Sequence, residues 1–403
     1  MEGVMRPQEP QGLSGGVNQH GVRDYNERLI LSTIQRLGPH AGSEIARMTG
    51  LSPQTVSVIL RALEQDGLLE RGTPQRGRVG KPSVPMGLSP EGVFAFGLKI
   101  GRRSADLVLT DFFGIVRHQL QVTYRYPMPM DLLDFLRSGI AAITAKMPSK
   151  QRSRIAGIGI AQPHEIWNWH ETIGAPSEEL ASWREVDFVD QISRFSSLPV
   201  FIENDATAAC RAEHIYGRGR EFRDFAYFFV GSFIGGGVVL NHSIFDGAQG
   251  NAGAFGSLPA RRPDGSIGQL LDTASLYLLE AAIVEAGMEP SRLWTQPQDW
   301  SGFPELLDAW IDRAAVELAH AALTVCSVID FGAVLIDGAF PEVVRSRLIE
   351  GVESELATLD SRGLVLPVIG AGRVGGNARA IGAACGPVVS QYLLNTHSGF
   401  SGG

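Results

Sequence analysis

The feature that most constrains the fold is a series of three short helical patterns near the N-terminus, each followed by a glycine. Apolar side chains recur at helical spacing in residues 26–37 and again in the short stretch 42–49. A third helix is expected to begin at Pro53 and to run to about residue 65, because Ser52 can cap the free amides and proline suits the first helical position. The expected core positions are Leu29, Ile30, Ile34, Leu37, Ile45, Ala46, Met48, Val56, Ile59, Leu60 and Leu63.

Helix, short helix, glycine turn, helix and hairpin, in this order, are typical of a winged helix-turn-helix domain. Residues 71–85 would form the hairpin loop, or wing, and the segment 71–90 holds four basic side chains and no acidic one. In such domains the second helix of the motif enters the major groove, and the wing cations lie near the DNA backbone or minor groove. A three-helix module that binds protein is the alternative, and the acid-free wing argues against it. The candidate DNA-contacting residues are Ser52, Gln54, Thr55, Ser57, Arg61, Arg76, Arg78 and Lys81.

Charge and cysteine content exclude several other classes. Residues 1–92 hold ten Lys and Arg against nine Asp and Glu, so the negative charge of the chain, −8 in total, lies in the remainder. This distribution fits a small DNA reader attached to an acidic body. The three cysteines are far apart and form neither a disulfide framework nor a C-x-x-C pair, which favours a reducing cytoplasm. No uninterrupted apolar stretch of about 18 residues exists, so no membrane span is expected.

From residue 92 onward the pattern changes, after a short linker expected over 82–90. Three consecutive strands are followed by alternating helices and strands, and a second half of similar organisation follows it. This order is typical of the ribonuclease-H-like halves of an actin/hexokinase-type α/β fold. Strands are expected at 93–100, 104–111, 115–123, 155–161, 200–202, 225–231, 236–240 and 333–336, and helices at 130–146, 182–195 and 306–329.

Several segments, taken in order and spacing, resemble the ROK family, named for repressors, open reading frames and kinases. The strongest is residues 198–213, in which a strand leads to Glu-Asn-Asp and an alanine-rich helix. The other matching segments are 231–237, 246–256, 336–338 and 375–384. The resemblance implies a winged helix-turn-helix followed by a two-lobed actin/hexokinase-like domain.

The patterns and the resemblance together divide the chain into four parts. A disordered tail is expected over residues 1–22 and a winged helix-turn-helix domain over 23–88. A small α/β lobe is expected over 92–203 together with about 380–396, and a large α/β lobe over 204–379.

The family's kinases use the Asp of Glu-Asn-Asp to deprotonate a sugar hydroxyl, and the resemblance assigns this position to Asp205. Asp205 could equally hold that hydroxyl by a charge-assisted hydrogen bond, with Asn204 on a neighbouring one. Capping of the helix that starts there is the structural alternative for both residues. The expected ligand-binding residues are Gln162, His164, Glu165, Asn204, Asp205, Asn251 and Ser257.

The phosphate loop departs from the family pattern of Asp-x-Gly-Gly/Ala-Thr. This chain reads Lys99-Ile100-Gly101-Arg102-Arg103, so a lysine replaces the acid that serves magnesium. Phosphoryl transfer depends on metal-assisted charge stabilisation. We therefore expect no catalytic residues and no kinase activity, while the arginines leave binding of a nucleotide or phosphorylated ligand open.

The family's sugar- and zinc-contacting Glu and His are replaced by Ala254 and Ser257. The cysteine-rich zinc loop that usually follows is absent, since no cysteine lies between Cys210 and Cys326. No metal and no cofactor are therefore expected. Trp183 is expected to pack against a helix rather than to stack on a sugar.

The resemblance implies a DNA-binding repressor of carbohydrate-utilisation genes that acts as a homo-oligomer and is controlled by a sugar or sugar derivative, and the cysteine content favours a cytoplasmic location. Its expected partners are a double-stranded DNA operator, the small-molecule ligand and further copies of itself, in a homodimer or homotetramer, with no membrane partner. The alternatives are an active sugar kinase with an appended DNA-binding domain and a ligand-independent DNA-binding protein.

Overall fold

The computed structural model describes residues 19–74, 83–163, 166–169, 176–262, 264–294 and 298–394. Its N-terminal domain contains the three expected helices, α1 (Gln19–Leu37), α2 (Gly42–Thr49) and α3 (Pro53–Gln65). The Ser52 hydroxyl accepts a hydrogen bond from the Thr55 amide at 3.1 Å, which caps α3 as predicted. Helix α1 begins four residues before the expected domain boundary, and the rest of the expected tail lies outside the described residues.

The core of this domain follows the predicted pattern with three exceptions, of which Leu29 is half-buried. All four apolar positions predicted for α3 are buried. Leu37 and Met48 were expected in the core but are exposed, by 52% and 38%. Leu31 is buried at 2% exposure instead, because the residue one position beyond Ile30 also faces the rest of the protein.

A three-stranded antiparallel sheet completes the winged domain, in the order β1 (His40–Ala41), β3 (Pro85–Leu88) and β2 (Leu69–Arg71). The expected hairpin is formed by β2 and β3, which pair from Leu69 with Leu88 to Arg71 with Met86. Strand β3 is buried throughout. Residues 85–88, in the middle of the expected linker 82–90, therefore belong to the winged domain. The wing residues Arg76, Arg78 and Lys81 lie outside the described part of the chain.

The small lobe is built on a five-stranded sheet with the strand order β6-β5-β4-β7-β8. The first three strands form the expected antiparallel meander, and β7 and β8 continue the sheet in parallel. The strands are β4 (Phe94–Ile100), β5 (Ser104–Thr110), β6 (Val116–Thr123), β7 (Ile155–Gln162) and β8 (Val200–Asn204), with helices α4 (Pro129–Thr144) and α5 (Ser149–Arg152).

The prediction of a single helix over residues 182–195 is wrong. The chain forms α7 (Ser177–Ala181), a 3-10 turn at Ser182–Arg184 and α8 (Phe188–Ser193). The 3-10 turn ends at Arg184, and Asp187 caps α8 by accepting the Val189 and Asp190 amides. Trp183 packs as expected, because it is buried, stacks on Phe188 and donates its indole N–H to the Pro127 carbonyl at 3.0 Å.

The large lobe repeats this plan in a second five-stranded sheet, of order β11-β10-β9-β14-β15. It too begins with three antiparallel strands and continues with two parallel ones. The repeat confirms the actin/hexokinase-like fold class. Its elements are β9 (Phe225–Val230), β10 (Ile234–Leu240), β11 (Ser243–Ile244), β12 (Pro259–Arg261), β13 (Ile267–Gln269), β14 (Ala333–Gly338), β15 (Val368–Ala371), α10 (Leu271–Ala274), α11 (Leu276–Glu285), α12 (Pro304–Ile329) and α13 (Glu342–Leu356).

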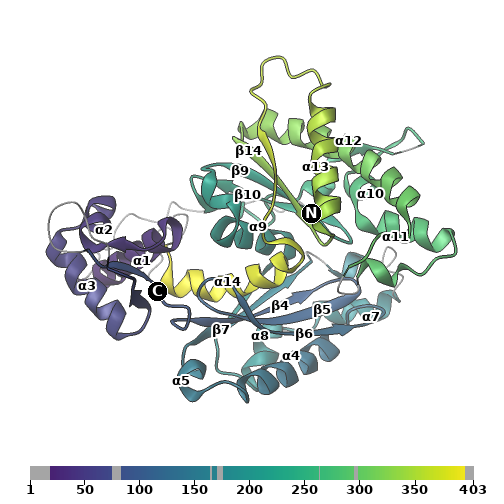
Figure 1. The fold of residues 1–403 in the computed structure, drawn as a ribbon. Coiled ribbons are helices and arrows are strands. Elements are labelled where there is room, and N and C mark those ends of the chain that lie inside the picture. Colours follow the sequence, from purple (N-terminus) through teal and green to yellow (C-terminus); the bar gives the residue numbers. More distant parts are fainter. Residues whose placement is uncertain are drawn as a thin grey trace, which may run out of the picture.

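Two helices cross the centre of the molecule, α9 (Asp205–Tyr216) and α14 (Ala378–Tyr392). Figure 1 shows α14, in yellow, running from the junction of the lobes over the small-lobe sheet to the winged domain. Glycines permit this close packing. A Cβ at Gly382 would clash with the Ala208 carbonyl of α9, and a Cβ at Gly159 would clash with the Ala383 carbonyl of α14.

The winged domain is docked on the body through a shared apolar core. A single cluster of buried side chains includes Ile30 and Leu31 of α1 together with Val388 and Val389 of α14. Polar contacts surround this cluster. Gln35 donates to the Ile215 carbonyl at 2.7 Å, and the Leu394 amide donates to the Ser32 hydroxyl at 2.8 Å.

Arg154, between α5 and β7, joins the end of α3 to the body. Its guanidinium donates to the carbonyls of Gly67 at 2.9 Å and Asp66 at 3.0 Å. The same group donates to the Glu91 carbonyl at 3.1 Å. One side chain therefore fixes the turn after α3 and the connection between the domains. No helix in the described part of the chain is long and apolar enough to cross a membrane.

Candidate functional site

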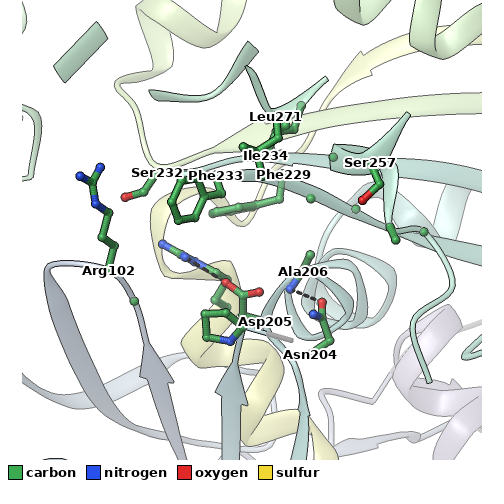
Figure 2. Close-up of a pocket in the computed structure, with 18 of the residues that line it drawn as sticks. Arg102, Asn204, Asp205, Ala206, Phe229, Ser232, Phe233, Ile234, Ser257 and Leu271 are labelled. Carbon is green, nitrogen blue, oxygen red and sulfur yellow. Dashed lines mark hydrogen bonds and ion pairs between the residues drawn. The ribbon is translucent and has the colours of Figure 1, made fainter. Parts of the chain in front are cut away.

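A cavity of about 470 Å³ lies between the lobes. Its wall is formed by the turn after β4, the start of α9, the β9–β10 hairpin, the loop that precedes β12, and the start of α14 (Figure 2). Pockets of this size suit a small organic ligand. Aromatic side chains form part of the wall, and Phe229 and Phe233 lie next to each other above Asp205 in Figure 2.

Asn204 and Asp205 both line this cavity, at the junction of β8 and α9. The Asn204 Oδ1 accepts the amides of Ala206 at 2.9 Å and Thr207 at 3.2 Å. Asn204 therefore does cap α9, and its Nδ2 group is the donor that it can offer to a ligand.

Asp205 forms an ion pair across the cavity floor. Its Oδ2 lies 3.2 Å from Nη1 of Arg379, in the first turn of α14, and both side chains are largely buried. The Arg379 guanidinium also lies over the Phe229 ring, 4.9 Å from its centroid. Since Oδ2 is engaged by the arginine, Oδ1 is the atom of Asp205 that can accept a ligand hydroxyl.

Lys99, which stands where the family pattern has an acid, is turned into the small lobe. Its Nζ lies 3.1 Å from Oδ2 of Asp106, the residue opposite it on β5, and also contacts Ser104. Burial lowers the pKa of Lys99, and the nearby Arg379 lowers it further, whereas Asp106 opposes the shift. Lys99 is not among the residues that line the cavity.

Arg102 does line the cavity, on the turn after β4. Its Nη1 lies 3.2 Å from Oε2 of Glu280 on α11, and its guanidinium lies 5.9 Å from the Phe233 ring centroid. Arg103 approaches the same Glu280 carboxylate at 3.6 Å. This pairing joins the turn of the small lobe to a helix of the large lobe.

Of the other expected ligand residues, some line the cavity and others do not. Asn251 and Ser257 line the cavity, as does Ala254. Gln162 does not line it, although it pairs with Asn204 in the sheet, and its buried Oε1 has no hydrogen-bond partner in the described part of the chain. His164 and Glu165 lie outside the described residues.

The glycine run of β10 serves packing between strand and helix. A Cβ at Gly235 would meet the Ala206 side chain, and a Cβ at Gly237 would meet Cys210, both on α9. Gly235 and Gly236 also line the cavity, so the small residues both admit α9 and widen the site.

The exposed face of α3 carries the residues expected to contact DNA. Ser52, Gln54, Ser57 and Arg61 are exposed, and Thr55 is half-buried beside its cap. Ser57 and Arg61 line a groove together with Arg71, whose guanidinium is held by Glu64 at 2.6 and 2.9 Å.

Some residues of the α3 surface and of the cavity were not predicted from the sequence. Val58 is 65% exposed on α3, and such an apolar side chain can contact a thymine methyl group. Arg379 lies in a segment that resembles the family, but nothing in the sequence indicated that it would face Asp205. Among the described residues no group of three or more His, Cys, Asp or Glu is arranged to hold a metal ion.

Comparison with known families finds matches to two segments of the chain. Residues 23–70 match the model of a winged helix-turn-helix DNA-binding domain, and residues 95–272 match the model of the ROK family. The chain therefore carries a winged helix-turn-helix domain followed by a ROK family domain.

Several curated proteins are similar over much of their length. The uncharacterized protein y4fQ of Sinorhizobium fredii is 25% identical over 91% of this chain and 92% of its own. The xylose repressor of Bacillus spizizenii is 26% identical over 60% of this chain and 62% of its own, so the similarity spans less than two thirds of that repressor. The DNA-binding transcriptional dual regulator NagC of Escherichia coli is 25% identical over 68% of this chain and 67% of its own.

Solved structures confirm the fold. A ROK family transcriptional regulator, homologous to the Escherichia coli MLC protein, matches with a TM-score of 0.63 at 20% identity, over 90% of this chain and 95% of that one. A ROK family glucokinase from Streptomyces griseus, in complex with glucose and AMPPNP, matches with a TM-score of 0.54 at 20% identity, over 72% of this chain and 98% of that one.

Proposed function

We propose that this protein is a DNA-binding repressor of carbohydrate-utilisation genes, whose affinity for its operator is set by a sugar or sugar derivative in the cavity between the lobes. The winged helix-turn-helix domain and the similarity to the xylose repressor and NagC support DNA binding and repression. The polar groups of Asn204, Asp205, Asn251 and Ser257 around the cavity support a hydroxylated ligand.

One observation carries the link between ligand and DNA. Helices α9 and α14 both begin at the cavity, with Asp205 and Arg379 in their first turns. Both end at the winged domain, where the Ile215 carbonyl accepts from Gln35 and Val388 and Val389 pack in the shared cluster. A ligand that binds one arrangement of these helices more tightly than another shifts the position of the DNA reader.

The same arrangement supports regulation rather than phosphoryl transfer. The position that would serve magnesium is Lys99, which is paired with Asp106, and the carboxylate in the position of the kinase base is paired with Arg379. We therefore propose that the domain is not a kinase. Formation of ADP from ATP and magnesium with any sugar of a broad panel would contradict this part of the proposal.

We further propose that the protein acts in the cytoplasm as a homodimer or homotetramer, since paired helix-turn-helix domains read operators of matching two-fold symmetry. The proposed domains are the winged domain over 23–88, the small lobe over 92–203 with about 380–396, and the large lobe over 204–379. The expected operator therefore contains two half-sites, separated by about one helical turn or a multiple of it.

The test is fluorescence anisotropy of the full chain on DNA from upstream of its own gene, repeated with a panel of sugars and sugar derivatives. The proposal expects saturable binding at physiological salt and a change in affinity with one class of ligand. Binding that no member of the panel alters would favour the ligand-independent alternative. The absence of binding to any fragment of a genomic selection would refute the DNA-binding function itself.

A further inference from the structure

The wall of the cavity at Arg102 carries more positive than negative charge. Arg102 and Arg103 both pair with the single carboxylate of Glu280, at 3.2 and 3.6 Å. Among the described residues no second carboxylate lies within ion-pair distance of either guanidinium. Two cations therefore share one negative charge at this wall.

Arg102 also has hydrogen-bonding capacity that the protein does not use. Its side chain is 12% exposed, and its Nε is buried without a hydrogen-bond partner in the described part of the chain. A buried donor without a partner is unfavourable, and a guanidinium matches the planar oxygen pairs of carboxylate and phosphate groups. Burial lowers the pKa of Arg102, and the neighbouring Arg103 adds to this shift, whereas Glu280 opposes it. An added anion would offset the excess positive charge of the two arginines.

The rest of the cavity suits hydroxyl groups. Figure 2 shows Arg102 beside the Ser232 hydroxyl on one side of the cavity, with Asn204 and Asp205 on another. At the second position Asp205 and Arg379 neutralise each other, and Asn204 offers an amide. The two ends of the cavity therefore differ in charge.

We propose that the cavity binds a hydroxylated compound that also carries an anionic oxygen group, a carboxylate or a phosphate, which Arg102 and Ser232 hold while the hydroxyls bind Asn204 and Asp205. This inference names the class of ligand that the proposed regulator would bind. Only the claim that this ligand changes operator binding rests on the proposed function. Neutral sugars would fill the hydroxyl end and leave the space beside Arg102 and Ser232 without an anionic group.

The first experiment uses inorganic phosphate, which does not depend on the stereochemistry of a sugar. Thermal unfolding of the full chain is followed while phosphate replaces chloride at constant ionic strength. We expect a saturable rise in Tm that Arg102→Gln abolishes. Arg103→Gln is the matched control, because Arg103 pairs with the same Glu280 but does not line the cavity. An equal rise in Arg102→Gln would place the phosphate elsewhere and overturn the proposal, as would the absence of a rise in the parent protein.

The second experiment compares neutral sugars with their uronates and 6-phosphates by titration calorimetry. We expect an anionic member to bind at least about tenfold more tightly than its neutral parent, and Arg102→Gln to remove this preference. Glu280→Gln should strengthen binding of the same member, because it removes the competing carboxylate. The uronate and phosphate arms distinguish the two anionic groups. A preference for neutral sugars in the parent protein would overturn the inference while leaving operator binding, measured separately without ligand, unaffected.

Discussion

The carboxylate of Asp205 and the guanidinium of Arg379 lie 3.2 Å apart at the floor of the cavity, and they join the first turns of α9 and α14. A ligand hydroxyl can bind the other oxygen, Oδ1, while Oδ2 stays with Arg379. Ligand bound at Asp205 therefore contacts the start of α9 beside α14, and it can bias the relative position of two helices that also touch the DNA-binding domain.

Asp205→Ala should abolish the response to ligand and leave operator affinity without ligand within about twofold of the parent value, since the residue is remote from the groove lined by α3. Operator binding with and without the regulating ligand, measured by anisotropy, checks this. Asp190→Ala is the control, because Asp190 forms an exposed ion pair with Arg194 on α8. A normal response in Asp205→Ala would refute Asp205 as a ligand contact.

Arg61→Ala should weaken operator binding about five- to tenfold without changing Tm, because Arg61 is exposed on α3 and a lost DNA contact costs roughly 1 kcal/mol or more. The dependence of affinity on salt shows whether Arg61 contacts phosphate or base. Arg137→Ala, an exposed arginine on α4, is the control. Unchanged affinity in Arg61→Ala would contradict the assignment of α3 as the helix that enters the groove.

Arg154→Ala should loosen the winged domain from the body. The change removes bonds to the carbonyls of Gly67, Asp66 and Glu91, of which the Gly67 bond is partly buried and the other two are exposed. A partly buried carbonyl left unpaired costs about 1 kcal/mol, and exposed carbonyls can bond to water instead. We expect faster hydrogen exchange in residues 53–72 and a weaker ligand response. Arg152→Ala, at the exposed end of α5, serves as the control. Unchanged exchange would show that the apolar cluster alone fixes the docking.

The sequence predicts local structure well where a single side chain decides it. Ser52 and Pro53 define the start of α3, and the meander of the small lobe follows from alternation and turns. The helix expected over 182–195 failed because Asp187 competes for the backbone amides and starts a new helix.

The ligand site was predictable only in part, because some of its residues contact partners that are far away in the sequence. Asn204 and Asp205 are neighbours in one segment, so a local resemblance finds them. Arg379 reaches Asp205 from 174 residues away, and Glu280 reaches Arg102 from 178 residues away. Such partners are fixed by the packing of the two lobes, which no local pattern encodes.

Gly382→Ala should destabilise the protein by about 3 kcal/mol or more, because the added methyl group meets the Ala208 backbone, which cannot move like a flexible side chain. Gly376→Ala, where a Cβ meets no atom within 4 Å, is the control. Chemical denaturation measures both variants. Equal stability would mean that α9 and α14 can separate, and would weaken their proposed role in transmitting ligand occupancy.

His214 should make the protein less stable in acid. It is half-buried on α9, and desolvation lowers its pKa from 6.5 to about 4, so the native state resists protonation while the unfolded chain accepts it. Stability is therefore full above pH 6.5 and falls as the pH drops toward about 4, by about 3 kcal/mol in total. Denaturation across this range should show a smaller decline in His214→Gln. An identical decline in both proteins would assign the acid sensitivity to other groups.

The cluster shared by α1 and α14 has a consequence for how such proteins can be recombined. Because Ile30 and Leu31 share one apolar cluster with Val388 and Val389, the interface between the winged domain and the body is formed by two segments that lie far apart in the sequence. A chimera that exchanges only the N-terminal segment would place a foreign surface against the native C-terminal helix. A chimera with a new operator specificity must therefore keep Ile30 and Leu31 of α1. Otherwise the last turns of α14 have to be exchanged together with the winged domain.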